Sequence, residues 1–434
     1  MIEKGNKKVI NAWAFYDWAN SVYPLVITTA IFPMFYEAVT TTTLADGTNS
    51  DMVEFWGSTF RNSEIYSYIV SASFLVVSII SPILSGIADY ADNKKRFLQF
   101  FCYLGAISCA SLYFFDVNHL ELSMLPVFFA SIGFWGSIVF YNAYLPEIAD
   151  ASQHDRISAK GYALGYLGSS ILLIICLAVI MGVGAEYTKY SFIAVALWWI
   201  GFSQITYARL PNHAFGEKPK ENKFTKGWLE LKKVWHQLND LKALKKYLIA
   251  FFVYSMGVQT VMLMATLFAA KEINWGEDSA AKTGLIVSVL IIQFIAIGGA
   301  YLFSWLSKKL GNIKALVISN VIWVGICIGA YYIHEPVEFY IIAAIVGLVM
   351  GGIQSLSRST YSKLLPATKD HASFFSFYDV LEKLGIVIGT FAYGFIEGVT
   401  GSMRNSIFAL ITFFILGLIL LIRVPNKKVI ESVS

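Results

Sequence analysis

Long runs of apolar residues, separated by short polar segments, recur along the whole chain. A helix needs about 20 mostly apolar residues to cross the roughly 30 Å hydrocarbon core of a bilayer. Membrane strands would instead show runs of about ten residues in which apolar and polar side chains alternate. The pattern therefore predicts twelve membrane-spanning helices, over residues 11–38, 64–88, 97–115, 122–146, 158–184, 189–210, 247–270, 283–306, 313–333, 337–361, 372–398 and 404–423.

The composition agrees with this pattern. Of the 434 residues, 56% are hydrophobic and only 14% are charged, whereas a soluble domain carries roughly 25% charged residues. We therefore expect an all-α integral membrane protein.

Lysine and arginine residues concentrate in every second loop. Cytoplasmic loops are enriched in these residues, so we expect both termini in the cytoplasm and the chain in the cytoplasmic (inner) membrane. The same bias accounts for the net charge of +4 without a nucleic-acid partner, which would need a basic soluble domain.

One motif occurs twice. The pattern YxxxLPxxxD spans Tyr141–Asp150 and again Tyr361–Asp370. Weak internal symmetry of this kind is typical of transporters built from duplicated halves, with the substrate site between the halves. We expect two pseudo-symmetric six-helix bundles, residues 1–210 and 247–434, joined by a cytoplasmic linker, 211–246.

The linker contains a helical stripe of apolar side chains among many lysines. Its members are Phe224, Trp228, Leu231, Trp235 and Leu238. The stripe predicts an amphipathic helix that lies on anionic lipid. The alternative is a solvated linker helix.

The loop after the second predicted helix reads GIADYADNKKR. It resembles the signature loop of the major facilitator superfamily, whose matching positions are Gly86, Asp89, Lys94, Lys95 and Arg96. The resemblance implies that the glycine permits close helix contact and that Asp89 meets the N-terminus of the eleventh helix, latching a cytoplasmic gate. The alternative is an ordinary basic loop. The corresponding loop of the second half has Ser307 in place of the acid, so we expect any latch there to be degraded.

Longer strings give a narrower resemblance. AFYDWANSVYP, YNAYLPEIA with DRISAKGYALGYLGS, and GGIQSLSRSTYSKLLP with FFSFYDVLEKLG are similar to the "unknown major facilitator" group related to the fungal vacuolar amino-acid effluxer. The resemblance implies the major facilitator fold and transport, and it suggests amino-acid efflux.

Polar side chains line one face of several predicted helices. Asp17, Asn20 and Ser21 share a face of the first helix, and Gln259 lies on a matching stripe of the seventh. The remaining candidates for a central cavity are Tyr141, Asn142 and Gln354. The alternative is that small polar residues hold the helices together.

Ionisable residues inside spans are functional candidates, because a charge at the bilayer centre costs about 2.5–3.5 kcal/mol. We predict an ion-pair network of Arg358, Asp379, Glu382 and Lys383. Glu382 or Asp17 would exchange a proton if its charged partner changes during transport. The alternatives are a permanent structural network and direct contact with substrate.

Tryptophans at span ends suggest interfacial belts. Trp13 and Trp305 are predicted there, whereas Trp18 and Trp135 lie deeper and could line a cavity.

The sequence lacks signs of catalysis. The histidines have no metal-ligand spacing, and the phosphate-binding pattern GxxxxGK[ST] is absent. We expect a monomeric transporter, not an enzyme, that works by alternating access with a small solute, membrane lipids and protons as partners and without metal or cofactor. The alternatives are uptake of another organic solute, and a lipid-handling or sensor protein.

Overall fold

The computed structural model describes residues 4–43, 49–211, 223–276 and 278–425. Each predicted span coincides with a long helical segment. The first is α1 (Lys7–Asn20), a π-helical stretch (Tyr23–Ile31) and α2 (Phe32–Thr40), followed by α3 (Asn62–Tyr90), α4 (Lys94–Ser111), α5 (Leu120–Ala143), α7 (His154–Gly182) and α8 (Thr188–Arg209). The later helices are α10 (Lys242–Glu272), α11 (Asp278–Leu310), α12 (Asn312–Tyr332), α13 (Pro336–Leu364), α14 (His371–Thr400) and α15 (Met403–Ile422).

Among the described residues, eleven segments are long and apolar enough to cross a membrane. The remaining predicted span, 372–398, corresponds to α14, which has 30 residues but is not one of the eleven. It carries Asp379, Glu382 and Lys383 within little more than one turn, which lowers its hydropathy. The all-α membrane fold predicted from the sequence is confirmed.

Shorter elements lie between the spans. They are α6 (Leu145–Ile148), the linker helix α9 (Lys223–Asp240), and 3-10 turns at Leu112–Phe114, Val117–His119, Ala151–Gln153 and Ala185–Tyr187. The segment that follows α2 forms two antiparallel hairpins, β1 (Thr42–Thr43) with β2 (Asn49–Ser50) and β3 (Met52–Phe55) with β4 (Ser58–Arg61).

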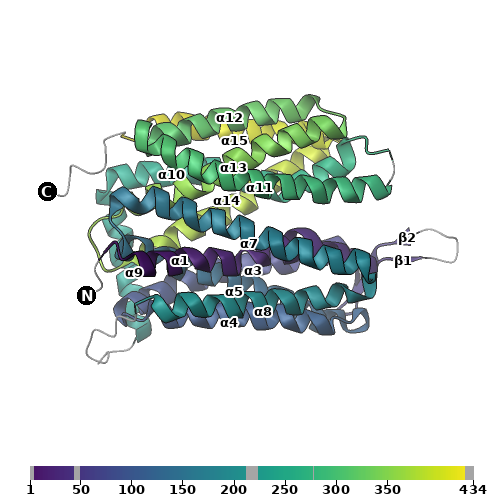
Figure 1. Cartoon of the computed structure of the whole chain (residues 1–434), viewed down its shortest axis with the longest axis horizontal. Coiled ribbons are helices and arrows are strands. Elements are labelled where there is room, and N and C mark those ends of the chain that lie inside the picture. The colour runs from purple at the N-terminus through teal and green to yellow at the C-terminus, as the bar shows by residue number, and fades with distance from the viewer. Residues whose placement is uncertain (1–3, 44–48, 212–222, 277, 426–434) are drawn as a thin grey trace.

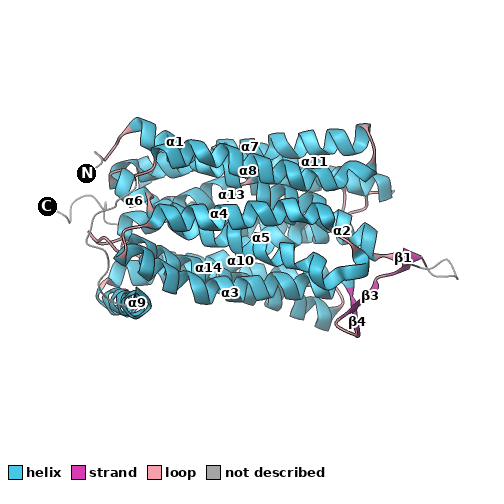
Figure 2. Cartoon of the chain, turned by 90° about the horizontal axis from the view of Figure 1, so that it is seen from below, coloured by secondary structure: helices cyan, strands magenta, loops and turns pink. Residues whose placement is uncertain are grey.

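The helices run side by side along one axis, with both chain ends at the same end of the bundle and the hairpins at the other (Figures 1 and 2). Helices α1 to α8 lie together in the lower part of Figure 1, and α10 to α15 lie together above them. Between the two groups, α7 packs against α11 and α13, and α3 and α5 pack against α14.

A glycine stripe brings α1 and α7 close together. A Cβ atom at Gly165 would collide with the Ser21 hydroxyl, and one at Gly168 would lie 2.8 Å from the Trp18 ring. The GYALGYLGS string therefore serves close helix packing.

Two tryptophans predicted at the membrane interface behave differently. Trp305 is half exposed, with Lys309 Nζ 4.0 Å from its ring centroid. The prediction for Trp13 is wrong, because its side chain is fully buried, stacks on Tyr141 and donates to the Tyr141 carbonyl oxygen at 2.9 Å.

Candidate functional site

A buried ion pair joins the two groups of helices. Arg358 of α13 lies 3.1 Å from the Asp17 carboxylate of α1, measured from Nη2 to Oδ2. The Tyr141 hydroxyl donates to the same oxygen at 2.8 Å. Arg358 and Asp17 are only 2% and 5% exposed. Buried charges are tolerated when they are paired and hydrogen-bonded, and this pair meets both conditions.

The rest of the guanidinium group is also occupied. Arg358 Nε donates to the Ser158 hydroxyl at 2.9 Å, and Nη2 donates to the Ser158 carbonyl oxygen at 3.0 Å. Nη1 lies 3.4 Å from Asn142 Oδ1. The Tyr162 ring stacks on the group at 4.2 Å, which adds a cation–π contact.

The predicted network of Arg358 with the ionisable residues of α14 is wrong. Arg358 points to α1 and α7, whereas Asp379 pairs with Lys383 one turn along α14. Glu382 accepts a hydrogen bond from Gln259 Nε2 at 2.7 Å. Similar depth in the membrane does not determine which neighbour a side chain faces, because helix rotation decides that.

The Asp379–Lys383 pair is itself buried. Lys383 is 1% exposed, and its Nζ lies 4.1 Å from the centroid of the Trp135 ring on α5. The second oxygen of Asp379 is buried and has no hydrogen-bond partner among the described residues. Trp135 therefore covers a charged pair rather than lining an open cavity.

A pocket of about 290 Å³ lies beside Glu382. Its walls come from α7, α10, α13 and α14, and so from both groups of helices. The lining residues are Tyr162, Phe251, Tyr254, Ser255, Val258, Gln259, Ile353, Gln354, Ser357, Tyr378 and Glu382. Next to it, the Tyr166 hydroxyl donates to Gln354 Oε1 at 2.5 Å across the two groups.

The candidate cavity residues thus divide among three places. Gln259 and Gln354 line the pocket, whereas Asp17, Tyr141 and Asn142 surround Arg358. The other two, Asn20 and Ser21, do not line the pocket. The Ser21 hydroxyl lies 3.4 Å from Asn20 Oδ1 and packs against Gly165 of α7. They fit the alternative of helix packing.

Sequence reasoning missed the tyrosines of this pocket. Tyr162, Tyr254 and Tyr378 line it together with Ser357. Tyrosine is common at membrane interfaces, so its presence in a span is a weak signal. The position of Tyr254 beside Ser255 on the polar stripe of α10 is the one cue that could have pointed to it.

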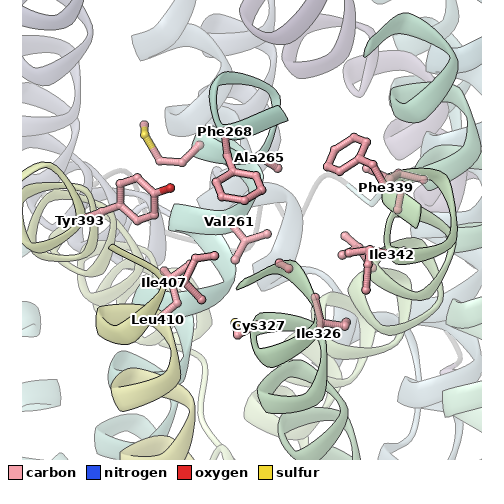
Figure 3. A pocket seen from close by; sticks show the side chains of 15 residues that line it. Val261, Ala265, Phe268, Ile326, Cys327, Phe339, Ile342, Tyr393, Ile407 and Leu410 are labelled. Carbon is pink, nitrogen blue, oxygen red and sulfur yellow. The ribbon is translucent and has the colours of Figure 1, made fainter. Parts of the chain in front are cut away.

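A larger cavity, of about 580 Å³, lies within α10 to α15 (Figure 3). Apolar side chains such as Phe268, Phe339 and Ile407 form its walls, and no ionisable acid or base other than Tyr393 and Cys327 lines it. This cavity is separate from the polar pocket, and its walls offer nothing to orient a charged solute.

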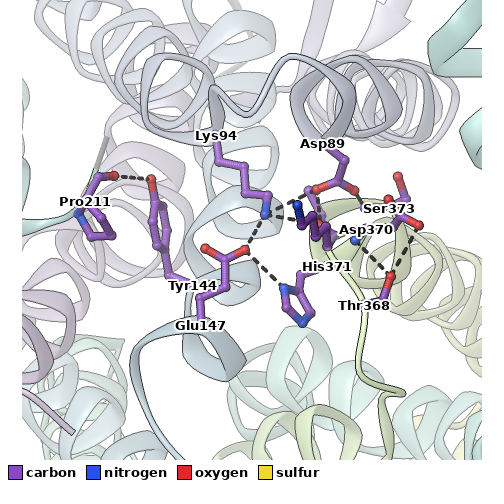
Figure 4. A network of polar contacts seen from close by, with 11 residues as sticks. Asp89, Lys94, Tyr144, Glu147, Pro211, Thr368, Asp370, His371 and Ser373 are labelled. Atoms are coloured by element: carbon purple, nitrogen blue, oxygen red, sulfur yellow. Dashed lines mark hydrogen bonds and ion pairs between the residues drawn. The ribbon is translucent and has the colours of Figure 1, made fainter. Parts of the chain in front are cut away.

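At the end that carries both termini, Asp89 meets the start of α14 (Figure 4). Its carboxylate accepts the backbone N–H groups of Ala372 at 3.2 Å and Ser373 at 2.7 Å. Gly86, one turn earlier, is buried in α3. A carboxylate is stabilised at a helix N-terminus by unpaired amides and the helix dipole, so Asp89 ties α3 to α14 as the resemblance implied.

Further charges surround this contact. Lys94 lies 3.3 Å from Asp89 and forms a short ion pair with Glu147, and His371 Nδ1 lies 3.1 Å from Glu147 (Figure 4). The other basic residues of the loop are less involved: Lys95 donates to the Leu210 carbonyl oxygen. Arg96 has no side-chain hydrogen bond or ion pair within the described chain.

The second loop also forms a latch, so the prediction that it is degraded is wrong. The Ser307 hydroxyl donates to Asp155 Oδ2 at 2.8 Å, and Asn312 donates to Asp155 Oδ1 at 2.7 Å. Lys363 lies 2.5 Å from Asp155. The acid is present but comes from the first turn of α7, in the opposite half of the chain.

Among the described residues, no group of three or more His, Cys, Asp and Glu side chains could hold a metal ion. The ionisable residues of the site instead pair with each other and with amide, hydroxyl and aromatic groups. Such an arrangement can bind and orient a polar solute.

Comparison with known proteins places this arrangement in a family. The family described as vacuole effluxer Atg22 like matches residues 5–433. The chain belongs to the Atg22-like family. An uncharacterized MFS-type transporter of Bacillus subtilis, YxiO, is 31% identical over 96% of this chain and 95% of its own. Autophagy-related protein 22 of Yarrowia lipolytica is 24% identical over 87% of this chain and 78% of its own.

The fold of this Atg22-like chain is also found among solved structures. The proton:xylose symporter XylE superposes with a TM-score of 0.71 over 97% of this chain and 96% of that chain, at 12% identity. With the family match and the MFS-type relative of Bacillus subtilis, this fold makes the Atg22-like chain an integral membrane transporter of the major facilitator superfamily, a class of non-enzymatic carriers.

Proposed function

We propose that this transporter moves an amino acid or a related small polar metabolite out of the cytoplasm by alternating access. Residues 1–210 and 247–434 would rock against each other in the cytoplasmic membrane, with both termini in the cytoplasm. The observation that carries the proposal is the polar pocket beside Glu382, which both halves line deep within the helices.

The contacts between the halves support a rocking motion. Four such contacts all lie in the part of the bundle nearer the chain ends. They are made by Asp17, Asp89, Asp155 and Tyr166. With the proposed orientation, the cytoplasmic side of this conformation is closed. Moving between states would break these contacts together, since each joins one half to the other.

The chemistry of the pocket fits a zwitterionic solute. Glu382 offers a carboxylate for an ammonium group, and Gln259 and Gln354 offer amides for a carboxylate. Glu382 has an amide rather than a cation as its direct hydrogen-bond partner, so it is also our candidate for proton exchange. Asp17 Oδ2 is bound by both Arg358 and Tyr141, which favours a structural role for that pair.

Counterflow in proteoliposomes tests the proposal. Vesicles loaded with one unlabelled amino acid should accumulate the same labelled amino acid, and Gln259→Ala should reduce the initial rate. Thermal-shift screening of the purified protein against metabolites at two pH values would first select the solute. Stabilisation by lipids alone, with no polar solute active in either assay, would contradict the proposal.

The apolar cavity of Figure 3 favours lipid handling as a second candidate. In that case the thermal shift would respond to lipids, and substitution of Phe268 on the cavity wall would remove the response. Uptake of a different organic solute would instead appear as counterflow with a non-amino-acid ligand.

A further inference from the structure

The linker helix α9 lies across the end of the bundle where both chain termini lie. In Figure 2 it is seen nearly end-on, while the long helices run across the view. It packs against α3 of the first half and against α10 and α14 of the second. A helix so placed runs along the plane of the membrane surface.

Three contacts define which way each side of α9 faces. Val234 is fully buried against the bundle. Lys233 Nζ lies 2.9 Å from Asp370, the residue just before α14, whereas the Trp235 ring lies 5.7 Å from the ring of Phe377, further along α14. Because α14 enters the membrane in that direction, the Trp235 side of α9 faces the bilayer and the Lys233 side faces the cytoplasm.

The bilayer side carries a short stripe of exposed residues. Trp228, Lys232 and Trp235 follow one another at spacings of four and three, which places them on one side of a helix. The two tryptophans are 58% and 59% exposed. Tryptophan favours the membrane interface, and lysine near the surface is attracted to anionic headgroups. The predicted members Phe224 and Leu231 lie outside the described side chains.

We propose that α9 docks on anionic headgroups of the inner leaflet through Trp228, Lys232 and Trp235. Docking would keep the helix strapped across α3 and α14. Since Asp370 directly precedes the α14 amides that bind Asp89, anionic lipid would favour the closed cytoplasmic gate. This inference rests on the proposed orientation of the chain, but not on the identity of a solute.

Site-specific fluorescence in nanodiscs tests the docking. An environment-sensitive label is attached to full-length protein carrying Trp228→Cys, and the four native cysteines are buried. Spin-labelled lipids in a phosphatidylglycerol bilayer should quench this label strongly. Adding Lys232→Gln should lower the docked-to-undocked ratio about fivefold, since one lysine contributes about 1 kcal/mol at an anionic surface.

The matched control is a label at Asp240→Cys. This exposed residue lies seven positions after Lys233, on the cytoplasmic side of the same helix, and lipid should quench it little. Equal quenching at both positions would overturn the proposal, and so would strong quenching at 228 that is unchanged in phosphatidylcholine. Since neither readout needs a substrate, such a failure would leave the proposed transport function untouched.

Discussion

At the scale of single residues, Asp17 and Arg358 form a buried ion pair in which each charge depends on the other. Both groups are nearly inaccessible, so removing one leaves the other buried without compensation. We expect Asp17→Asn to lower the free energy of unfolding by about 3–5 kcal/mol, measured by thermal or chemical unfolding in detergent. Replacing Arg358 by Gln in the same chain should recover part of that loss.

An exposed ion pair provides the control. Lys271 and Glu397 lie 3.1 Å apart, with the lysine side chain 61% exposed. Exposed pairs contribute about 0–1 kcal/mol, so Lys271→Gln should change stability little. If Asp17→Asn and Lys271→Gln changed the free energy of unfolding equally, the buried ion pair would contribute no more stability than the exposed one.

Gly161 provides a second prediction at this scale. A Cβ atom there would collide with the Asp17 carboxylate and lie 2.9 Å from Arg358 Nη2. Overpacking of a core costs about 1–3 kcal/mol, so Gly161→Ala should lower the melting temperature and slow transport. Gly325→Ala is its control, since nothing lies within 4 Å of that position; its stability should be unchanged or higher. A Gly161→Ala protein as stable as wild type would refute the close contact.

Glu382 is the residue that tests proton coupling. Glu382→Gln keeps the side-chain size and can still bond to Gln259, but it cannot release a proton. If Glu382 exchanges the proton, counterflow should continue but need a higher solute concentration, because the ammonium group loses its carboxylate, while the response of net transport to a pH gradient is lost. If the Glu382→Gln protein responded to the pH gradient like wild type, Glu382 would be excluded from proton coupling. Gln259→Glu cannot replace this test, because it adds a second acid beside Glu382.

At the scale of elements, the proposed cytoplasmic gate depends on the contact between a carboxylate and a helix N-terminus. Asp89 binds the first amides of α14, and Asp89→Asn removes the negative charge that the helix terminus favours. We expect the equilibrium to shift toward a cytoplasm-open state. A cysteine at Ser362, which is buried near the end of α13, should then react faster with a membrane-impermeant thiol reagent applied from the cytoplasm.

Asp116→Asn is the control for the gate. Asp116 lies in the connection between α4 and α5, at the opposite end of the bundle, where its side chain is exposed. It should leave the labelling rate at position 362 unchanged. An unchanged rate in Asp89→Asn as well would show that Asp89 does not hold the gate.

At the scale of the whole molecule, the spans could be predicted because bilayer thickness imposes their length. The predicted run 158–184 matches α7, and the predicted run 372–398 matches α14 despite the charges of Asp379 and Lys383. The contact of Asp89 with α14 could be predicted as well, because the local sequence GIADYADNKKR resembles the signature loop of the major facilitator superfamily.

The direction in which buried side chains point could not be predicted in the same way. Asp17 and Arg358 are far apart along the chain, and only the packing of α1 and α13 against α7 brings them together. The position of Trp13 near the end of a span predicts an interfacial side chain, but its ring stacks inward on Tyr141. Local hydropathy holds no information on helix rotation, which depends on neighbours distant in sequence.

The two latches at the end of the bundle near the chain termini give the chain a built-in asymmetry. In one, Asp89 of the first half accepts the backbone N–H groups that begin α14; in the other, Asp155 of the first half accepts the Ser307 hydroxyl. A dimer of two identical first halves would bring Asp89 of one copy near Asp155 of the other at both places, and a dimer of two second halves would have no acid in either latch. Two unlike halves in one chain give both latches an acid paired with hydrogen-bond donors. Neither half can therefore be replaced by a duplicate of the other.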